Sequence, residues 1–443
     1  MYRFINHFYR YSGILMGKTI LISFVIIVTF FSNAQTSGET KMKAPALMQL
    51  VLDSLSKKYP DLVNFPDKFR FKIAFTEVQR KNGKVALETV TFRTDIKEYL
   101  YPASIVKLPT LLVTMEEFNK IKEKQPLIEY KSTIKFVKDK GCLPSMNQIK
   151  IGNRIFPASL DVLSKQVLAV SDNDAYNRLF DFCGQQTLNR RLKDLNFNQG
   201  KIIRKFVLNC TLDQNRVSDS LVVFGKRNER LYTRPTIVNT DTIFIDTSYK
   251  LGLSYEGFNK QMINRPFDFS KQNNLDILDI HKVLTGVVFP KSTMSHRFNI
   301  TPEQRKYVLQ NLGRYPDEYG LAYNSLEYYP TYKKYLFFGR DSKLNYLSDT
   351  LSRFRSFNVV GVSFGCVIDA AYLIDFETGK EFFLTVGIYA NQDGVINDAK
   401  YDYDTLAYPV MKDIGRLFMT YISENKDAVE YLKSFGKELE LIK

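Results

Sequence analysis

Strongly apolar, strand-like segments lie near both ends of the 443-residue chain. Residues 71–76 and 85–92 flank one Gly-containing turn, and residues 363–376 and 381–390 flank another. Runs of β-branched and aromatic residues on either side of such a turn predict β-hairpins. Because helical periodicity fills much of the chain between them, we expect the hairpins to meet in one sheet. The sequence predicts a composite α/β (α+β) fold, with an antiparallel sheet flanked by helices and a helical region beside it.

Apolar residues recur with helical spacing through most of the remaining chain. Helices are expected at 45–58, 100–117, 160–169, 174–183, 188–195, 277–284, 301–311 and 413–437. The stretch from about 206 to 269 has an extended pattern instead, interrupted by Gly and Pro. We expect one domain over residues 35–443, with a sheet part at about 45–100 and 345–443, a helical part at about 101–344, and a β-rich insertion at about 206–269.

The N-terminus has the features of a secretory signal peptide. Basic residues precede an apolar run at 19–31, and Ser32-Asn33-Ala34 places small residues at the two positions that a signal peptidase recognises. The run is shorter than the roughly 20 residues that a membrane-spanning helix needs. The sequence therefore predicts a signal peptide at 1–34, cleaved after Ala34. The mature chain is expected to be secreted or periplasmic, with no stable membrane anchor.

Composition excludes several classes of partner and cofactor. The formal net charge is +15, but Lys and Arg are dispersed and form no nucleic-acid-binding motif, so nucleic acid is not an expected partner. Three His and no Cys-x-x-Cys spacing give no expectation of a metal site, and no motif indicates an organic cofactor. The four Cys residues allow three disulfide pairings in an exported protein, and the sequence leaves the choice open. They are Cys142, Cys183, Cys210 and Cys366.

A Ser-x-x-Lys pattern is the first sign of catalysis. It occurs five times, but only Ser104-Ile105-Val106-Lys107 lies in an apolar setting, within Tyr-Pro-Ala-Ser-Ile-Val-Lys-Leu-Pro. On a helix these two side chains share a face, and the positive helix end favours the serine oxyanion. Burial can lower the pKa of the Lys enough for it to accept the serine proton. The alternative is an N-terminal Ser that caps a helix beside a Lys extended toward solvent.

Ser171-Asp172-Asn173 is the second sign, and it occurs once, between two predicted helices. A Ser hydroxyl at such a turn can relay a proton to a leaving nitrogen. An Asn amide can hold both a catalytic Lys and a substrate carbonyl. The alternative is a helix N-cap, which Ser-Asp-Asn would also form well.

These two motifs, in this order, resemble those of the class A β-lactamases and related penicillin-recognising serine hydrolases. The stretch from Gly361 to Tyr372 resembles the strand that carries the family's third motif, followed by a hairpin partner at 382–389. The resemblance covers roughly residues 45–200 and 275–435. It implies that Ser104 is the acylated nucleophile, Lys107 its general base and Ser171 the proton shuttle.

The resemblance also implies a substrate-binding set. Asn173 would position the substrate, and Gly361 and Val362 would lie on the strand that completes an oxyanion hole with the Ser104 backbone N–H. In the family the third motif begins with Lys, whereas here either Asn358 or Val359 stands in its place. That Lys binds a substrate carboxylate, so penicillins are expected to be poor substrates unless another cation, such as one from 206–269, substitutes.

A second departure is the lack of a recognisable Glu-x-x-Leu-Asn loop for deacylation, of which Glu256-Gly-Phe-Asn259 is only a weak echo. The leading hypothesis is an exported serine hydrolase that cleaves an amide, β-lactam-like or cell-wall peptide-like, through an acyl-Ser intermediate. The expected partner is thus a small-molecule or peptide substrate, β-lactam or peptidoglycan-like. Two alternatives stay open: a peptidase or esterase on the same fold, and a non-catalytic relative that binds a cell-wall fragment.

Overall fold

The computed structural model describes residues 42–197, 200–206, 209–243, 245–292, 296–324, 326–340 and 348–442. The predicted signal peptide at 1–34 lies outside the described residues, so its cleavage stays a prediction. None of the described helices is both long and apolar enough to cross a bilayer.

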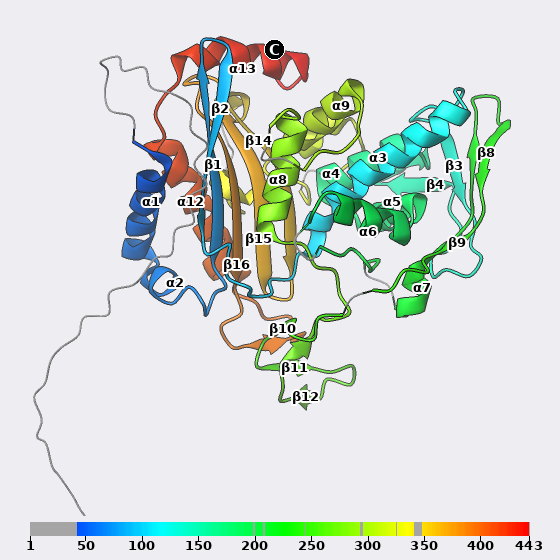
Figure 1. The fold of residues 1–443 in the computed structure, drawn as a ribbon, viewed down its shortest axis with the longest axis horizontal. Coiled ribbons are helices and arrows are strands. Elements are labelled where there is room, and N and C mark those ends of the chain that lie inside the picture. The colour runs from blue at the N-terminus through cyan, green and yellow to red at the C-terminus, as the bar shows by residue number, and fades with distance from the viewer. Residues whose placement is uncertain are drawn as a thin grey trace, which may run out of the picture.

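A five-stranded antiparallel sheet joins the two ends of the chain (Figure 1). Across the sheet lie β14 (Phe354–Ser363), β15 (Cys366–Asp375), β16 (Glu381–Tyr389), β1 (Lys72–Lys81) and β2 (Lys84–Phe92). The two ends meet where β1 pairs with β16, with Phe75 opposite Leu384. β15 and β16 are buried at every residue, which requires that both faces of the sheet be covered. The predicted composite fold, with one sheet from both chain ends, is confirmed.

The expected strand at 363–376 is wrong at its start. The apolar run contains a tight turn, in which Phe364 and Gly365 have φ values of 52° and 78°. Two successive residues with positive φ form the hairpin turn that matches the twist of the flanking strands. The strand that carries Gly361 is therefore β14, and its hairpin partner is β15 rather than 382–389. A Phe in the turn concealed it, because the hydrophobic pattern continues unbroken through it.

Helices cover both faces of this sheet (Figure 1). On one face α1 (Ala44–Lys58) and α12 (Tyr408–Tyr421) share a core with the strands. On the other lie α8 (Ile277–Val288), α9 (Pro302–Gly313) and α13 (Lys426–Glu438). The single helix expected at 413–437 is wrong, because the chain becomes extended at Ile422 and Asn425 N donates to Thr378 O at 2.9 Å. A polar stretch therefore separates two amphipathic helices, α12 and α13.

The helical region stands beside the sheet (Figure 1). It consists of α3 (Lys107–Lys124), α4 (Leu160–Val170), α5 (Asn173–Cys183) and α6 (Gln185–Asp194). Three short strands within it, which the sequence did not predict, are β3 (Thr133–Phe136), β4 (Gln148–Ile151) and β5 (Arg154–Pro157). Each has only four residues, too few for an alternating pattern to stand out.

The extended stretch at 206–269 is made of short elements that pair with other parts of the chain. β7 pairs with β3 of the helical region, and β11 pairs in parallel with β17 (Val395–Ile396) near the C-terminus. Its elements are α7 (Leu212–Arg216), β6 (Val217–Ser218), β7 (Leu221–Phe224), β8 (Arg230–Arg234), β9 (Ile237–Val238), β10 (Lys250–Leu251), β11 (Ser254–Glu256), β12 (Met262–Ile263) and β13 (Phe267–Asp268). The remaining short elements are α2 (Pro60–Asn64), η1 (Ala103–Val106), η2 (Pro316–Tyr319), α10 (Tyr335–Phe338), α11 (Ser348–Arg353) and the π-helical turn η3 (Tyr403–Ala407).

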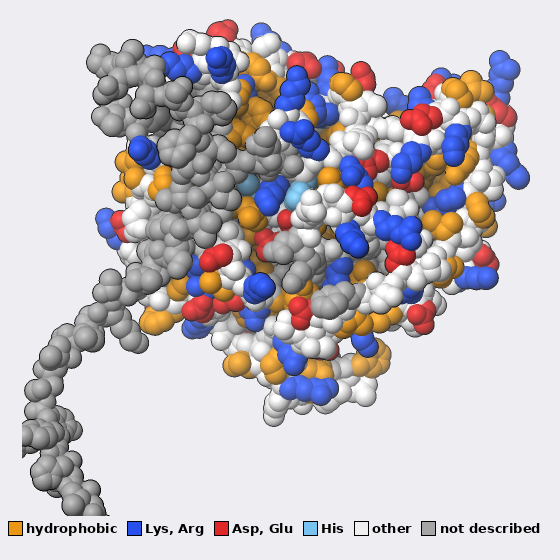
Figure 2. All heavy atoms as spheres, in the orientation of Figure 1, with side chains coloured by type: hydrophobic (Ala, Val, Ile, Leu, Met, Phe, Trp, Pro, Cys, Tyr) orange, Lys and Arg blue, Asp and Glu red, His pale blue; other side chains and the backbone are white. Residues whose placement is uncertain are grey.

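Charged side chains are mixed over the surface. Figure 2 shows Lys and Arg scattered among acidic and apolar side chains on the visible face, without a continuous basic stripe. This distribution agrees with the solvated basic surface expected from the sequence.

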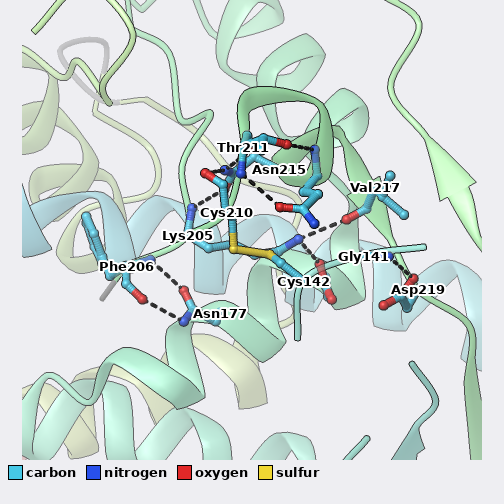
Figure 3. The surroundings of a disulfide bond; sticks show 12 residues. Gly141, Cys142, Asn177, Lys205, Phe206, Cys210, Thr211, Asn215, Val217 and Asp219 are labelled. Atoms are coloured by element: carbon cyan, nitrogen blue, oxygen red, sulfur yellow. Dashed lines mark hydrogen bonds and ion pairs between the residues drawn. A yellow bond between two sulfur atoms is a disulfide. The ribbon is translucent and has the colours of Figure 1, made fainter. Parts of the chain in front are cut away.

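One of the three disulfide pairings left open by the sequence is present. Cys142 and Cys210 are joined with a Cα–Cα distance of 5.7 Å, while Cys183 and Cys366 are buried free thiols. The bridge ties the loop before β4 to the segment before α7 (Figure 3). It closes a loop between residues 68 apart in sequence.

Removing this bridge is expected to destabilise the protein substantially. Loop-closure entropy for a loop of this length corresponds to about 4 kcal/mol at 25 °C. We expect Cys142→Ser together with Cys210→Ser to lower the free energy of unfolding by that order in denaturant titrations. A reductant should lower the melting temperature of the wild type and leave that of the double variant unchanged. An equal response of both proteins would contradict the pairing.

Candidate active site

Ser104 lies on a strained turn at the entrance to α3. It belongs to the 3₁₀ turn η1, which runs directly into α3, and it is partly exposed. The preceding residue, Ala103, has φ of 46°, a left-handed conformation that non-Gly residues rarely adopt. Such strain persists where the surrounding structure fixes it, and it is concentrated at functional sites.

β14 fixes that turn from the sheet side. A Cβ at Gly361 would lie 2.2 Å from Pro102 O and 3.2 Å from Ser104 N, so only Gly allows the strand to approach the turn. The structure thus brings Gly361 to the backbone of Ser104. Neither Gly361 nor Val362 is among the described residues that line the pocket beside Ser104.

Gly361→Ala is therefore expected to displace the Ser104 turn. The added methyl meets a backbone oxygen, so the strand or the turn must shift, at about 1–3 kcal/mol of stability. A misplacement of about 1 Å at a reacting group can lower a rate about a hundredfold. We expect slower acylation of the variant together with a lower melting temperature, measured on the same preparation. Wild-type values of both would show that the close approach does not position Ser104.

Lys107 is the buried base candidate, with 1% of its surface exposed. Its Nζ donates to the Ser171 carbonyl and to Asn173 Oδ1 at 2.8 Å, and it lies 3.1 Å from Ser171 Oγ. Burial lowers the pKa of Lys107 well below its usual value, the Lys333 charge lowers it further, and Asp172 opposes the shift. A neutral amine has two N–H groups for the two carbonyl-type oxygens and a lone pair for a hydroxyl. The surroundings of Lys107 therefore favour the form that can accept a proton.

The Ser171-Asp172-Asn173 turn joins α4 to α5. Ser171 ends α4 with φ of 55°, the second strained residue beside the pocket. Asp172 is the N-cap of α5, and its carboxylate accepts from Ala175 N at 2.7 Å. The turn is thus a helix cap, as the alternative interpretation held, and it also points Ser171 and Asn173 at Lys107.

Ser104, Lys107 and Ser171 line one pocket between the helical region and the sheet. Its unfilled space is about 460 Å³, part of it open to solvent. Asn358, Val359 and Val360 of β14 line it, and besides Lys107 so do three basic residues, Arg314, Lys333 and Lys334. None of the described residues that line it is Asp or Glu.

The structure distinguishes the two candidates for the family's third-motif position. Val359 packs against the core shared with the helical region, whereas Asn358 is 8% exposed and forms hydrogen bonds with Lys333, Lys334 and Asp369. Asn358 lines the pocket too, and its Nδ2 donates to Asp369 Oδ1 at 2.9 Å. Val359 is thus the side chain on the face toward the helical region, and β14 contributes no cation there.

The sequence left open that a cation from 206–269 could substitute, but no described residue of that stretch lines the pocket. Lys333 and Lys334 come from the loop before α10 instead. Sequence reasoning missed them, because the only local signal is a Lys pair within a Tyr-rich run. Glu256, the weak echo of a deacylating Glu, lies on β11 and is not among the lining residues.

Phe206 was also missed. Its ring lies 5.5 Å from Lys107 Nζ, and Asn177 of α5 holds its backbone by two hydrogen bonds, Asn177 Nδ2 to Phe206 O at 3.0 Å and Phe206 N to Asn177 Oδ1 at 2.8 Å (Figure 3). The adjacent Lys205 pairs with Asp181 at 2.8 Å, and the disulfide lies nearby. An aromatic ring, rather than a carboxylate, therefore covers this side of Lys107.

Metal-ligand clusters do not occur in the described parts of the chain, where no three His, Cys, Asp or Glu side chains gather. The two His residues in this part serve the core: His281 is buried between Thr76 and Thr385, and His296 contacts Asp279. Burial lowers the pKa of His281 to about 3, so it stays neutral.

Part of the chain matches a known protein family. A sequence model described as "Beta-lactamase enzyme family" matches residues 72–238, the part that holds Ser104, Lys107 and Ser171. No curated protein matches the chain. Solved structures that resemble it include a class A β-lactamase from Bacteroides cellulosilyticus DSM 14838, at 13% identity and a TM-score of 0.45, covering 85% of this chain and 96% of that one.

Two further solved structures are similar to a like degree. A β-lactamase from Sphaerobacter thermophilus DSM 20745 has 9% identity and a TM-score of 0.42, covering 84% of this chain and 95% of that one. PBP-A has 13% identity and a TM-score of 0.43, covering 86% of this chain and 98% of that one. The fold and the matched region define a β-lactamase-like serine hydrolase fold. The resemblance stated from the sequence is confirmed as far as a β-lactamase-like fold.

Proposed function

We propose that the protein is an exported serine hydrolase that cleaves an amide, in a β-lactam or a cell-wall peptide, through an acyl-Ser104 intermediate. The arrangement around Lys107 carries this proposal. A buried amine with a lowered pKa lies between two carbonyl-type oxygens and the Ser171 hydroxyl, in the same pocket as a Ser on a strained turn.

The proposed reaction has two halves. Lys107 Nζ accepts the Ser104 hydroxyl proton as Oγ bonds to the substrate carbonyl carbon. The C–N bond then breaks, and the nitrogen receives a proton from the Ser171 hydroxyl, which Lys107 replaces. The backbone N–H of Ser104, at the start of a helix, is placed to stabilise the oxyanion. Water must later cleave the Ser104 ester and return the acid product.

Export is supported by two features of the chain. The segment at 1–34 has the signal-peptide pattern, and the Cys142–Cys210 disulfide fits an oxidising compartment. A cell-wall peptide or a β-lactam would be encountered in that compartment.

The absence of a carboxylate from the described pocket lining supports a slow second half-reaction. A general base contributes about 10²–10⁴-fold to such a step. Phe206 stands beside Lys107 where it can exclude water but cannot activate it. A protein that acylates and then retains the acyl group is therefore favoured over a fast hydrolase.

The test is intact-mass analysis of the purified mature chain after incubation with a panel of β-lactams and acyl-D-Ala-D-Ala peptides. The proposal expects a covalent increase equal to the acyl group for at least one member. Binding of panel members without any adduct would leave the alternative of a non-catalytic cell-wall-binding protein.

A further inference from the structure

The cationic residues that line the pocket are not equivalent. Arg314 forms an ion pair with Glu440, with Nη2 and Oε2 3.3 Å apart. Lys334 is buried and donates to Leu312 O, Ser356 O and Asn358 Oδ1 at 2.6–3.1 Å, which uses its three N–H groups. Within the described part of the chain, Lys333 Nζ donates to one acceptor, Val170 O, at 2.5 Å. Two of its donors are left for a ligand.

Lys333 also lies close to Ser171 and Lys107. Val170 immediately precedes Ser171, so the ammonium of Lys333 lies at the turn that faces Lys107. Its charge is the second-largest cause of the lowered pKa of Lys107, which agrees with this proximity. The Tyr332 ring, 5.2 Å from Lys333 Nζ, lines the pocket next to it.

No carboxylate in the described residues forms an ion pair with Lys333. Burial lowers its pKa to about 8, with Asp172 opposing the shift from a distance, so the amine is mostly charged at neutral pH. A partly buried cation without a counter-charge is unfavourable, and a ligand anion would relieve that cost. The pocket is therefore suited to a substrate that carries its own negative charge.

The backbone of Lys333 is fixed by the sheet. Lys333 has φ of 60°, and its carbonyl accepts from Asn358 Nδ2 at 2.7 Å. The same amide group donates to Asp369 Oδ1, while Asp369 Oδ2 accepts from Leu336 N at 3.0 Å. Asn358 and Asp369 thus bind both ends of the short segment from Lys333 to Leu336.

We propose that Lys333 recognises a carboxylate of the substrate, and that Asn358 and Asp369 are positioning residues that hold Lys333 at the pocket. The inference rests on the proposed function in that it takes this pocket as the active site. The recognition cation thereby comes from the loop before α10, and the strand residue Asn358 acts through the Lys333 backbone.

Binding measurements in a Ser104→Ala background test this without turnover. The probes are an acyl-D-Ala-D-Ala peptide with a free carboxylate and the same peptide with a C-terminal amide, titrated by calorimetry. Lys333→Met should weaken carboxylate binding about ten- to hundredfold and amide binding less than about twofold. Lys333→Arg should retain the preference, and Lys260→Met, an exposed Lys elsewhere, should change nothing.

Asn358→Ala should lose part of the carboxylate preference. The double variant with Lys333→Met should bind as weakly as Lys333→Met alone, because Asn358 acts through Lys333. A merely structural Asn358 would weaken both probes equally and additively. Carboxylate affinity should be full below pH 7 and fall as the pH rises through about 8, the pKa of Lys333, and this fall should vanish in Lys333→Met.

Equal affinities for the two probes, or no carboxylate binding at millimolar concentration, would overturn the inference. Failure of the proposed function has a different signature: the carboxylate preference depends on Lys333, but wild-type protein forms no acyl adduct. If the wild type forms an acyl adduct but shows no carboxylate preference, the proposed function stands and the Lys333 inference fails.

Discussion

Ser104→Ala is expected to abolish acylation while leaving the fold intact. The hydroxyl is the only atom group lost, and Ser104 makes no described side-chain contact that stabilises the core. Loss of a nucleophile or its base lowers rates by about 10⁴-fold or more in comparable serine hydrolases. Lys107→Ala should cost nearly as much, and the double variant little more, because the two residues act as one proton-transfer unit.

The measurement is the rate of adduct formation by stopped intact-mass sampling, with melting temperature as the check on folding. Ser423→Ala is the matched control, since Ser423 also begins a Ser-x-x-Lys pattern but is exposed on the far segment between α12 and α13. Equal labelling of Ser104→Ala and the wild type would refute the assignment of the nucleophile.

The second large effect concerns release of the acyl group. Because no carboxylate is among the described lining residues and Phe206 covers Lys107, we expect an acyl-enzyme that accumulates. With nitrocefin or benzylpenicillin, product should appear as a burst of at most one equivalent of protein. A steady phase slower by about a hundredfold or more should follow, because a general base that would speed deacylation by that factor is missing.

Steady-state hydrolysis of benzylpenicillin distinguishes slow release of the acyl group from fast release. A kcat/KM of about 10⁷ M⁻¹s⁻¹ or more, near the top of the range for enzymes, would show an efficient β-lactamase with a deacylating group that the pocket does not reveal. Removal of the Phe206 ring by Phe206→Ala tests the covering role: it should admit water and shorten the lifetime of the adduct, whereas an unchanged lifetime would contradict it.

Most of the sheet could be predicted, because β15 and β16 are largely apolar and the strands lie in hairpins at both chain ends. β15 and β16 are buried at all their residues, so each gives a continuous hydrophobic run. The same continuity concealed the turn at Phe364 and Gly365, since an aromatic turn residue does not interrupt the pattern. The Cys142–Cys210 pairing depends on tertiary approach, which spacing cannot supply.

The local motifs of the site could be predicted, but its surroundings could not. The apolar setting singled out Ser104 and Lys107 among five similar patterns, and their roles stay predictions. Lys333 comes from a loop with no periodic pattern of its own, to which Asn358 and Asp369 are hydrogen-bonded. Phe206 reaches Lys107 through Asn177, a contact between segments far apart in sequence.

Peptide mapping of the trapped acyl-enzyme tests the central claim most directly. Mature wild-type protein would be acylated with the panel member that labels it, digested, and sequenced by tandem mass spectrometry. The account predicts the acyl group on Ser104, with stoichiometry near one. The account would be contradicted by an adduct on a Lys or at another Ser-x-x-Lys position, namely Ser54, Ser132, Ser423 or Ser434.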